Sequence, residues 1–401
     1  MSRIASFALF ATLSLAVVGG MHAYVWVRLV RDTALPEPWR RLAGLALVVL
    51  ALAVPLGLVA FRFAPRPLSQ ILPVVSFTWL GLAFLLFSVV LLLDAFRLVL
   101  HGSAWLADWL RTRPDPPADP ERRLFVARAL AGTAAVATAG VSALAFRSAT
   151  GPAEVTEVPV RLERLPPALS GLTIVQITDL HVGLTIRERD VRRVVEQVNA
   201  LRPDVVAVTG DLVDGSVAEL GRAVAPLGGL RARYGTYFVT GNHEYYSGPG
   251  QWLPELGRLG MRVLRNERVT VGDAGASIDL AGIDDHGAAR QYGRGHGPDL
   301  ARALDGRDPE RALVLLAHQP RGFGEAVESG VELQISGHTH GGQIAPFNLI
   351  VGAVFPYLRG LYRREEGARA GQIFVSRGTG YWGPPLRLGS PPEIAKLVLT
   401  S

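Results

Sequence analysis

The sequence predicts an α/β domain that follows an all-α region of about four membrane-spanning helices. The first third of the chain holds four apolar stretches, each close to the ~20 residues that a helix needs to cross a bilayer. The remainder alternates short β-branched runs with helix-period segments, which is typical of layered α/β domains. Apolar residues make up 49% of the 401 residues. Mean hydropathy is +0.26, which is high for a soluble protein.

The four apolar stretches run from about residues 4 to 27, 42 to 61, 72 to 93 and 129 to 146. The second contains Pro55, which a membrane helix can accommodate. A cleaved signal peptide is the alternative for the first stretch. No clear small-residue cleavage site precedes Arg28, so a retained span is favoured.

Arginine placement predicts the orientation of these spans. The loops after the first and third spans are rich in arginine: Arg28, Arg31, Arg40, Arg41, Arg97, Arg111, Arg113, Arg122, Arg123 and Arg128. The N-terminus and the second loop have only Arg3, Arg62 and Arg66. Basic loops stay on the cytoplasmic side, so we expect a multi-pass cell-membrane protein whose chain after Phe146 is extracytoplasmic. Arg122-Arg123 also resembles a twin-arginine export signal, although a positive-inside anchor is the favoured interpretation.

We expect three regions: a transmembrane region at 1–147, a linker and first strand at 148–170, and a globular domain at 171–401. The linker is punctuated by prolines, and residues 113–117 are predicted to form an irregular tether on the inner side. The chain has no cysteine, so a metal site must use oxygen and nitrogen ligands. The net charge of +6 is mainly arginine and fits membrane orientation better than nucleic-acid binding.

In the globular domain, β-branched runs predict strands and valines spaced three and four apart predict a helix. The first elements expected are a strand at 172–178, a helix at 187–201, a strand at 205–208, a weak helix at 220–230 and a strand at 237–239. Later strands are expected at 277–283, 312–317, 332–336, 372–376 and 393–399. This pattern does not distinguish a β-sandwich from a doubly wound sheet.

Five polar clusters follow apolar runs, where loops of an α/β sheet converge on ligands. They are Thr178-Asp179-Leu180-His181, Gly210-Asp211-Leu212-Val213-Asp214, Gly241-Asn242-His243-Glu244, His318, and Gly337-His338-Thr339-His340-Gly341-Gly342-Gln343. Asp, Asn and His supply the oxygen and nitrogen ligands that divalent metals prefer. These clusters therefore indicate a metal site.

The order of the clusters and their residue types resemble the motifs of the calcineurin-like metallophosphoesterases, over roughly residues 155–401. The final cluster and the apolar N-terminal third resemble the membrane-attached branch of that family. The resemblance implies a four-layer β-sandwich flanked by helices. It also implies a metal-dependent phosphoric ester hydrolase.

The resemblance implies two divalent ions, for which Mn, Fe and Zn all suit the donors. Asp179, His181 and His340 resemble ligands of the first ion. Asp211 resembles a bridging carboxylate, and Asn242, His318 and His338 resemble ligands of the second ion. Two ions about 3.5–4 Å apart can generate a hydroxide to attack phosphorus and can neutralise phosphate charge.

His243 resembles the family's general acid, and Asp214 resembles the carboxylate that orients it. Glu244 is expected to support the site or the fold, and Gln343 to anchor backbone. Gly210 and Gly241 are expected in tight turns. Arg387 is a minor candidate for contacting a substrate phosphate.

The resemblance implies an enzyme that hydrolyses phosphodiester or pyrophosphate bonds in lipid or lipid-linked substrates. It extends to the branch of the family that cleaves the pyrophosphate of UDP-diacylglucosamine. A tethered domain also meets lipid headgroups at high effective concentration. One alternative is a non-catalytic metal-binding envelope sensor or scaffold. A nuclease is the other, but no basic groove with interleaved aromatics is visible, so nucleic acid is not expected. The sequence does not indicate an oligomeric state.

Overall fold

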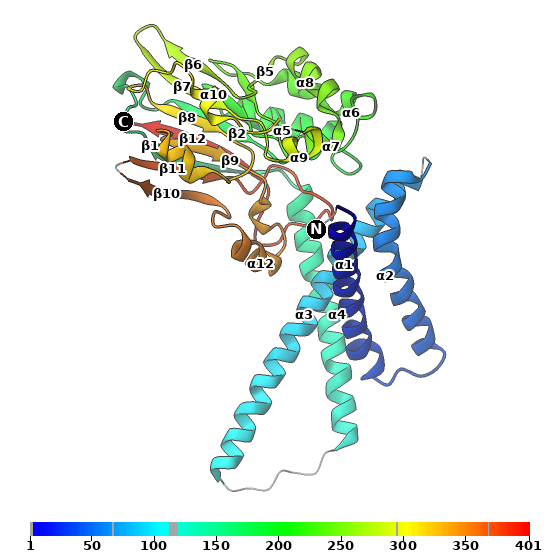
Figure 1. The fold of residues 1–401 in the computed structure, drawn as a ribbon. Coiled ribbons are helices and arrows are strands. Elements are labelled where there is room, and N and C mark those ends of the chain that lie inside the picture. The colour runs from blue at the N-terminus through cyan, green and yellow to red at the C-terminus, as the bar shows by residue number, and fades with distance from the viewer. Residues whose placement is uncertain (1–2, 66–67, 112–118, 294–295, 368) are drawn as a thin grey trace. The chain divides into compact units, whose positions relative to one another are not determined.

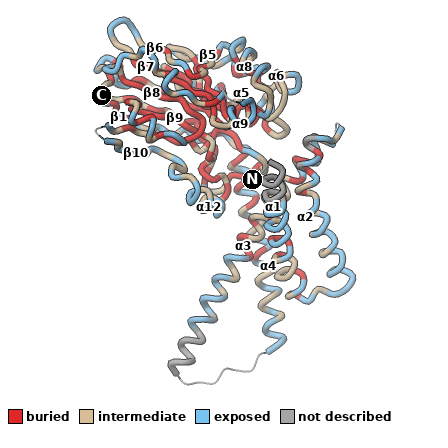
Figure 2. Tube along the Cα trace, in the orientation of Figure 1, coloured by how far each residue is buried: buried red, intermediate tan, exposed pale blue. Residues whose placement is uncertain are grey.

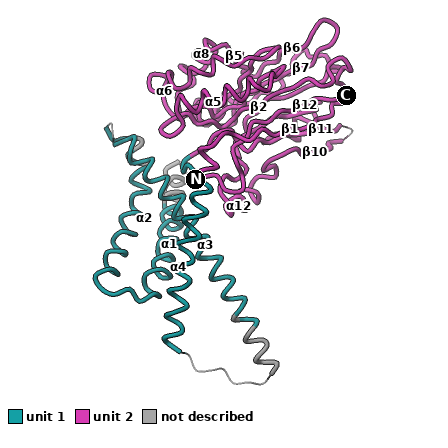
Figure 3. The backbone as a smooth tube through the Cα atoms, turned by 180° about the vertical axis from the view of Figure 1, so that it is seen from behind, with its two compact units in different colours: residues 1–146, 383–385 teal, residues 147–382, 386–401 magenta. Residues whose placement is uncertain are grey.

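The structure is a computed structural model that describes residues 3–65, 68–111, 119–293, 296–367 and 369–401. The chain divides into two compact units (Figure 3). The helical unit comprises residues 1–146 and 383–385, and the sandwich unit comprises residues 147–382 and 386–401.

Four long helices build the helical unit: α1 (Arg3–Trp26), α2 (Trp39–Phe63), α3 (Leu68–Arg111) and α4 (Pro120–Thr150) (Figure 1). All four are long and apolar enough to cross a membrane. The expected number of apolar helices is therefore confirmed. The helices extend beyond the apolar stretches because backbone hydrogen bonding continues where hydropathy falls. The predicted tether at 113–117 and Arg66 lie outside the described residues.

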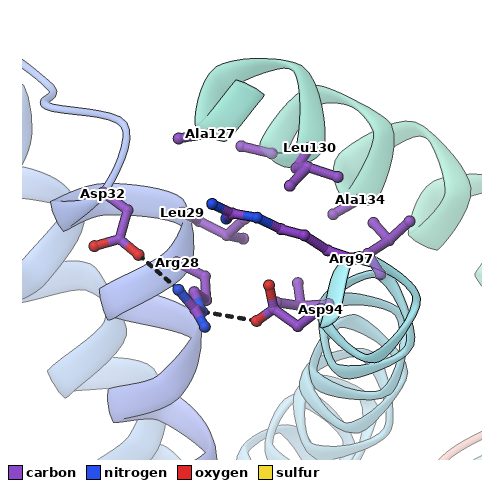
Figure 4. Close-up of a pocket in the computed structure, with 11 residues that line it drawn as sticks. Arg28, Leu29, Asp32, Asp94, Arg97, Ala127, Leu130 and Ala134 are labelled. Carbon is purple, nitrogen blue, oxygen red and sulfur yellow. Dashed lines mark hydrogen bonds and ion pairs between the residues drawn. The ribbon is translucent and has the colours of Figure 1, made fainter. Parts of the chain in front are cut away.

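Several ionisable side chains of the helical unit are paired. Asp94, expected near the end of the third span, lies within α3 and forms an ion pair with Arg28 at 2.7 Å (Figure 4). Arg28 follows α1 in a π-helical turn (Val27–Arg31) and also contacts Asp32 at 3.0 Å. His22 accepts a hydrogen bond from the Trp79 indole at 2.9 Å. Such pairing offsets the cost of polar groups in an apolar helix bundle.

Two six-stranded mixed sheets form the sandwich unit. The first sheet has the order β1 (Glu154–Arg161), β12 (Glu393–Thr400), β2 (Thr173–Ile177), β3 (Val205–Val208), β4 (Thr236–Phe238) and β5 (Met261–Val263). The second has the order β10 (Gly360–Glu366), β11 (Arg369–Val375), β9 (Leu333–Ser336), β8 (Leu313–Leu316), β7 (Ala276–Gly282) and β6 (Glu267–Asp273). Strands β2 to β5 run parallel, as do β7, β8 and β9.

The inner faces of the two sheets share one buried core. Its members alternate along each strand: Ile174, Val205, Ala207, Leu280, Val314, Leu316, Leu333, Ile335 and Leu397. Helices cover the outer faces. The first sheet is covered by α5 (Glu188–Ala200), α6 (Val217–Val224) and α8 (Pro249–Arg258), and the second by α10 (Leu300–Leu304) and α11 (Phe323–Glu328). The expected four-layer sandwich is therefore confirmed, and a doubly wound single sheet is excluded.

The valines that predicted helix α5 form its buried face. Val191, Val194, Val195 and Val198 are all buried against the first sheet. Each buried valine contributes roughly 1.5–3 kcal/mol, so this stripe holds the helix in place. The predicted helix at 220–230 is instead α6 followed by a 3₁₀ turn (Ala225–Gly229). Pro226 explains the change, because proline cannot donate to an α-helical ladder.

Several short elements were not expected from the sequence. Strands β5, β6 and β10 are absent from the prediction, as are α7 (Asn242–Ser247), α9 (Gly287–Tyr292) and α12 (Phe347–Val354). Short 3₁₀ turns also occur at Pro167–Leu169 and His340–Gly342. These elements are three to eight residues long, too short for periodicity to identify.

Candidate metal centre

All nine residues predicted for the metals and the acid–base pair come together at one end of the sandwich. They lie just after β2, β3 and β4 in the first sheet and β8 and β9 in the second, with Asn242 and His243 at the start of α7 and His340 at the start of a 3₁₀ turn. Because these strands run parallel within each sheet, their carboxyl ends share an edge. The topology therefore gathers side chains that are more than 150 residues apart in sequence, such as Asp179 and His338.

One group consists of Asp179, His181 and His340. The Nε2 atoms of His181 and His340 are 3.2 Å apart, and His340 Nε2 lies 3.5 Å from Asp179 Oδ1. All three side chains are mostly buried. Donor atoms this close together around a shared point suit a single divalent cation.

A neighbouring group consists of Asp211, His318 and His338. His318 Nε2 lies 3.1 Å from Asp211 Oδ2 and 3.2 Å from His338 Nδ1. Asp211 Oδ2 is also 3.9 Å from His181 Nε2. Asp211 thus lies between the two groups, where a bridging carboxylate is required.

Asn242 supplies an independent test of whether a cation fits. Its Oδ1 is buried and has no hydrogen-bond partner among the described residues. A buried acceptor without a partner is costly, whereas an amide oxygen is a good ligand for a divalent cation. The donor set therefore fits the metals that the family resemblance implies.

Backbone strain is concentrated at these loops. Nine non-glycine residues of the described chain have a positive φ, and five of them are predicted ligands: Asp179, His181, Asp211, His338 and His340. Such conformations cost of order 1–3 kcal/mol each and persist where the surroundings enforce them. Their concentration here is typical of a site arranged for binding.

Two glycines allow close approach to the carboxylates. A Cβ at Gly241 would lie 2.1 Å from Asp211 Oδ1, and one at Gly337 would lie 2.3 Å from Asp179 Oδ2. Gly241 was expected in a tight turn, but its φ of −100° is accessible to any residue. Glycine is needed there because the Asp211 carboxylate leaves no room for a Cβ. Gly210, which was also expected in a tight turn, has a φ of 86°, in the left-handed region that favours glycine.

Hydrogen bonds from the surrounding backbone fix the donors. The Thr209 carbonyl accepts a hydrogen bond from His318 Nδ1 at 2.8 Å, which turns Nε2 toward Asp211. Both oxygens of Asp179 accept from His338 N at 3.0 Å. Glu244 is buried and accepts from the backbone N–H groups of Gly241, Asp211 and Leu212, so it is a structural brace between loops.

Two histidines are held in the neutral form that metal ligation requires. Burial, reinforced by the charge on His318, lowers the pKa of His338 to about 3. Burial and then the Arg387 guanidinium hold the pKa of His340 well below its usual range. Each of these imidazoles is therefore uncharged at neutral pH.

His243 and Asp214 form a close pair beside the metal groups. His243 Nδ1 is 2.5 Å from Asp214 Oδ1, and His243 Nε2 is 3.9 Å from Asp211 Oδ2. Burial lowers the pKa of His243, but Asp211 and Asp214 outweigh it and raise the pKa to about 9. Burial raises the pKa of Asp214, but His181 and His243 outweigh it and hold that pKa well below its usual range. The arrangement favours a charged imidazolium at neutral pH.

Arg387, the minor candidate for a phosphate contact, is 1% exposed and has a structural role. Its guanidinium donates to the carbonyls of Arg377, Gly380 and His340. It therefore ties the loop bearing His340 to the loop after β11. Gln343 anchors backbone as expected, through hydrogen bonds with the N–H and carbonyl of Trp382.

Two aromatic side chains beside His243 were missed by the sequence reasoning. The rings of Tyr246 and Trp382 lie edge-on to the imidazole, with centroids 5.2 and 5.8 Å away. Both are substantially exposed. Trp382 stands in a Gly- and Pro-rich loop, where a large apolar side chain is a weak signal of contact with a ligand.

Comparisons with known proteins agree with this geometry. Residues 172–342 match the calcineurin-like phosphoesterase family. A Bos taurus protein named transmembrane protein with metallophosphoesterase domain is 38% identical, over 84% of this chain and 76% of that protein. A Danio rerio protein of the same name is 38% identical over 66% of this chain and 62% of that protein. An uncharacterized metallophosphoesterase of Helicobacter pylori is 40% identical over 61% of this chain and 64% of that protein. The chain therefore belongs to the calcineurin-like metallophosphoesterases, a family of metal-dependent phosphoric ester hydrolases.

Proposed function

We propose that this protein is a membrane-anchored phosphoesterase that hydrolyses phosphodiester or pyrophosphate bonds of lipid or lipid-linked substrates with two divalent cations. Asp179, His181 and His340 would hold one cation, and Asn242, His318 and His338 the other. Asp211 would bridge them. The observation that carries this proposal is the convergence of two donor groups on Asp211. The buried Asn242 Oδ1, which has no hydrogen-bond partner among the described residues, supports it.

When bound, the cations would supply a nucleophile near neutral pH and neutralise phosphate charge. The chain itself would supply the proton. His243 in its charged form would donate the Nε2 proton to the leaving oxygen, while Asp214 holds the Nδ1 proton and fixes the ring. A third group of close donor atoms consists of His181, Asp211 and His243, which makes metal ligation a competing role for His243. Its tight bond to Asp214 favours the proton donor.

The lipid part of the proposal is supported by the four apolar helices and by the short connection to the sandwich unit. Helix α4 ends at Thr150 and β1 begins at Glu154. A domain tethered so closely to a span meets lipid headgroups at high effective concentration. Arginine placement in the loops places this domain on the extracytoplasmic face in our proposal. A reporter fused after Ser401 that is active only in the cytoplasm would overturn this orientation.

The first experiment compares a chromogenic phosphodiester with the matching monoester. The full chain in detergent is stripped of metal and then supplied with Mn²⁺. We expect diester hydrolysis that needs metal and is lost in Asp211→Asn. Asp273→Asn is the matched control, because its carboxylate is exposed at the end of β6 and should leave turnover unchanged. Wild-type turnover in Asp211→Asn would refute the two-metal site.

A further inference from the structure

Helix α12 is an apolar helix with no buried residue. Its eight residues are Phe347-Asn348-Leu349-Ile350-Val351-Gly352-Ala353-Val354. All of them except Asn348 are apolar or glycine. The side chains of Leu349 and Val354 are 71% and 69% exposed, and those of Ile350 and Phe347 are 59% and 46% exposed. Figure 2 shows this helix as exposed and intermediate, in contrast to the buried strands of the same unit. Exposing so many large apolar side chains on one short helix is unfavourable in water.

The distribution of these side chains indicates what covers them. A helix that docks on a protein surface is apolar along one stripe and polar elsewhere. Exposed apolar residues in α12 occur at 347, 349, 350, 353 and 354, which do not leave a polar face. Apolar character on all sides is typical of a helix surrounded by hydrocarbon.

Charge around α12 also favours a lipid surface. From Gly337 to Arg364 the sequence contains no Asp or Glu, and Arg359 follows the helix. Arg363 and Arg364 lie farther along and form ion pairs with Glu365 and Glu366, so Arg359 carries the local positive charge. Arginines beside an apolar segment are attracted to anionic headgroups. The same chain carries four helices able to cross a membrane, so a bilayer is tethered to this domain.

The helix is joined directly to the candidate metal centre. It follows the 3₁₀ turn that contains His340, and a Cβ at Gly342 in that turn would lie 2.4 Å from the Asn348 Cα. Gln343, between the turn and the helix, holds the backbone of Trp382. Trp382 is 48% exposed and lies against His243. Indole rings favour the membrane–water interface.

We propose that α12 and Trp382 insert into the lipid surface and thereby place the metal centre at the headgroup level. The membrane contact stands independently of the catalytic proposal. Its consequence rests on the proposed function: the acyl chains of a lipid substrate would stay in the bilayer while the phosphoester reaches His243 and the metals.

The absence of cysteine from the chain permits a direct test. A single Ile350→Cys variant of the full chain carries an environment-sensitive nitrobenzoxadiazole label and is reconstituted in phosphatidylcholine–phosphatidylglycerol vesicles. Ala274→Cys is the matched control, because it is exposed in the β6–β7 turn at the opposite end of β7 from the metal centre. We expect spin-labelled lipid to quench the label at 350 strongly and the label at 274 weakly. Equal, weak quenching at both positions would overturn the proposal, as would a blue-shifted but unquenched label at 350, which indicates a protein partner.

A second variant tests the consequence for activity. Leu349→Gln with Ile350→Gln should reduce hydrolysis of a phosphodiester lipid in vesicles by at least about tenfold, since two large apolar side chains lose their lipid contact. Hydrolysis of a soluble chromogenic diester should be retained, which also shows that the variant folds. Equal rates for wild type and variant on the lipid would overturn the proposed consequence. If the wild type hydrolyses neither ester, the catalytic proposal fails, and the quenching measurement still decides whether α12 binds lipid.

Discussion

The two sheets contribute different chemistry to the candidate metal centre. The loops of the first sheet provide every carboxylate and amide of the site: Asp179, Asp211, Asp214 and Asn242, together with His181 and His243. The loops of the second sheet provide only imidazoles: His318, His338 and His340. The first sheet therefore supplies the negative charge that attracts cations. The second would supply nitrogen donors to both of the proposed cations.

This difference predicts unequal losses when one ligand is removed from each side. Asp179→Asn should lower metal-dependent turnover by at least about 10³-fold, because a charged ligand worth several kcal/mol is lost. His338→Gln removes a neutral donor and should cost less. Metal content measured by mass spectrometry, alongside turnover, checks the order. A larger loss in His338→Gln would mean that the histidine side, not the carboxylate side, controls metal retention.

The proton donor should be separable from metal binding. His243→Gln should lower kcat by about 10²–10⁴-fold, the usual contribution of a general acid. Both cations should remain bound, because His243 is assigned to Asp214 rather than to a metal. Loss of one cation in this variant would instead identify His243 as a ligand and remove the assigned acid.

Asp214 should matter less than the histidine that it holds. Asp214→Asn keeps a hydrogen-bonding group near His243 but removes its charge, and we expect a loss of about 10–100-fold in kcat. Because Asp214 also lies 3.3 Å from His181 Nδ1, metal affinity should be measured in the same variant. A double variant with His243→Gln should be no slower than His243→Gln alone. Additive losses would show that Asp214 acts independently of His243.

The smallest expected effect is on stability. Gly241→Ala should lower the free energy of unfolding by about 1–3 kcal/mol, since its Cβ would overlap the Asp211 carboxylate. Gly257→Ala is the matched control, because Gly257 is exposed on α8 and a Cβ there would meet nothing within 4 Å. That variant should gain about 0.5–1 kcal/mol. Thermal unfolding of the two variants measures the contrast, and equal midpoints would contradict the crowding at Gly241.

Long or strongly patterned elements were predictable from sequence. Strand β3 occupies Val205–Val208 as predicted, and α5 differs from its prediction by one residue at each end. Short elements such as β5 and α12 were not predictable, because three to eight residues carry too little periodicity. The site residues were recognisable because each stands in a short motif beside a strand.

The available side chains follow from the linear sequence: four apolar stretches, no cysteine, and Asp, Asn and His just after predicted strands. These are local properties, set by composition and by the period of each element. Four properties arise only once the chain is folded: Asp211 lies between two donor groups, the Asn242 oxygen has no hydrogen-bond partner among the described residues, Arg387 is buried and α12 is exposed. Each of these depends on contacts between residues far apart in the chain, because burial and convergence arise from packing and not from any single segment.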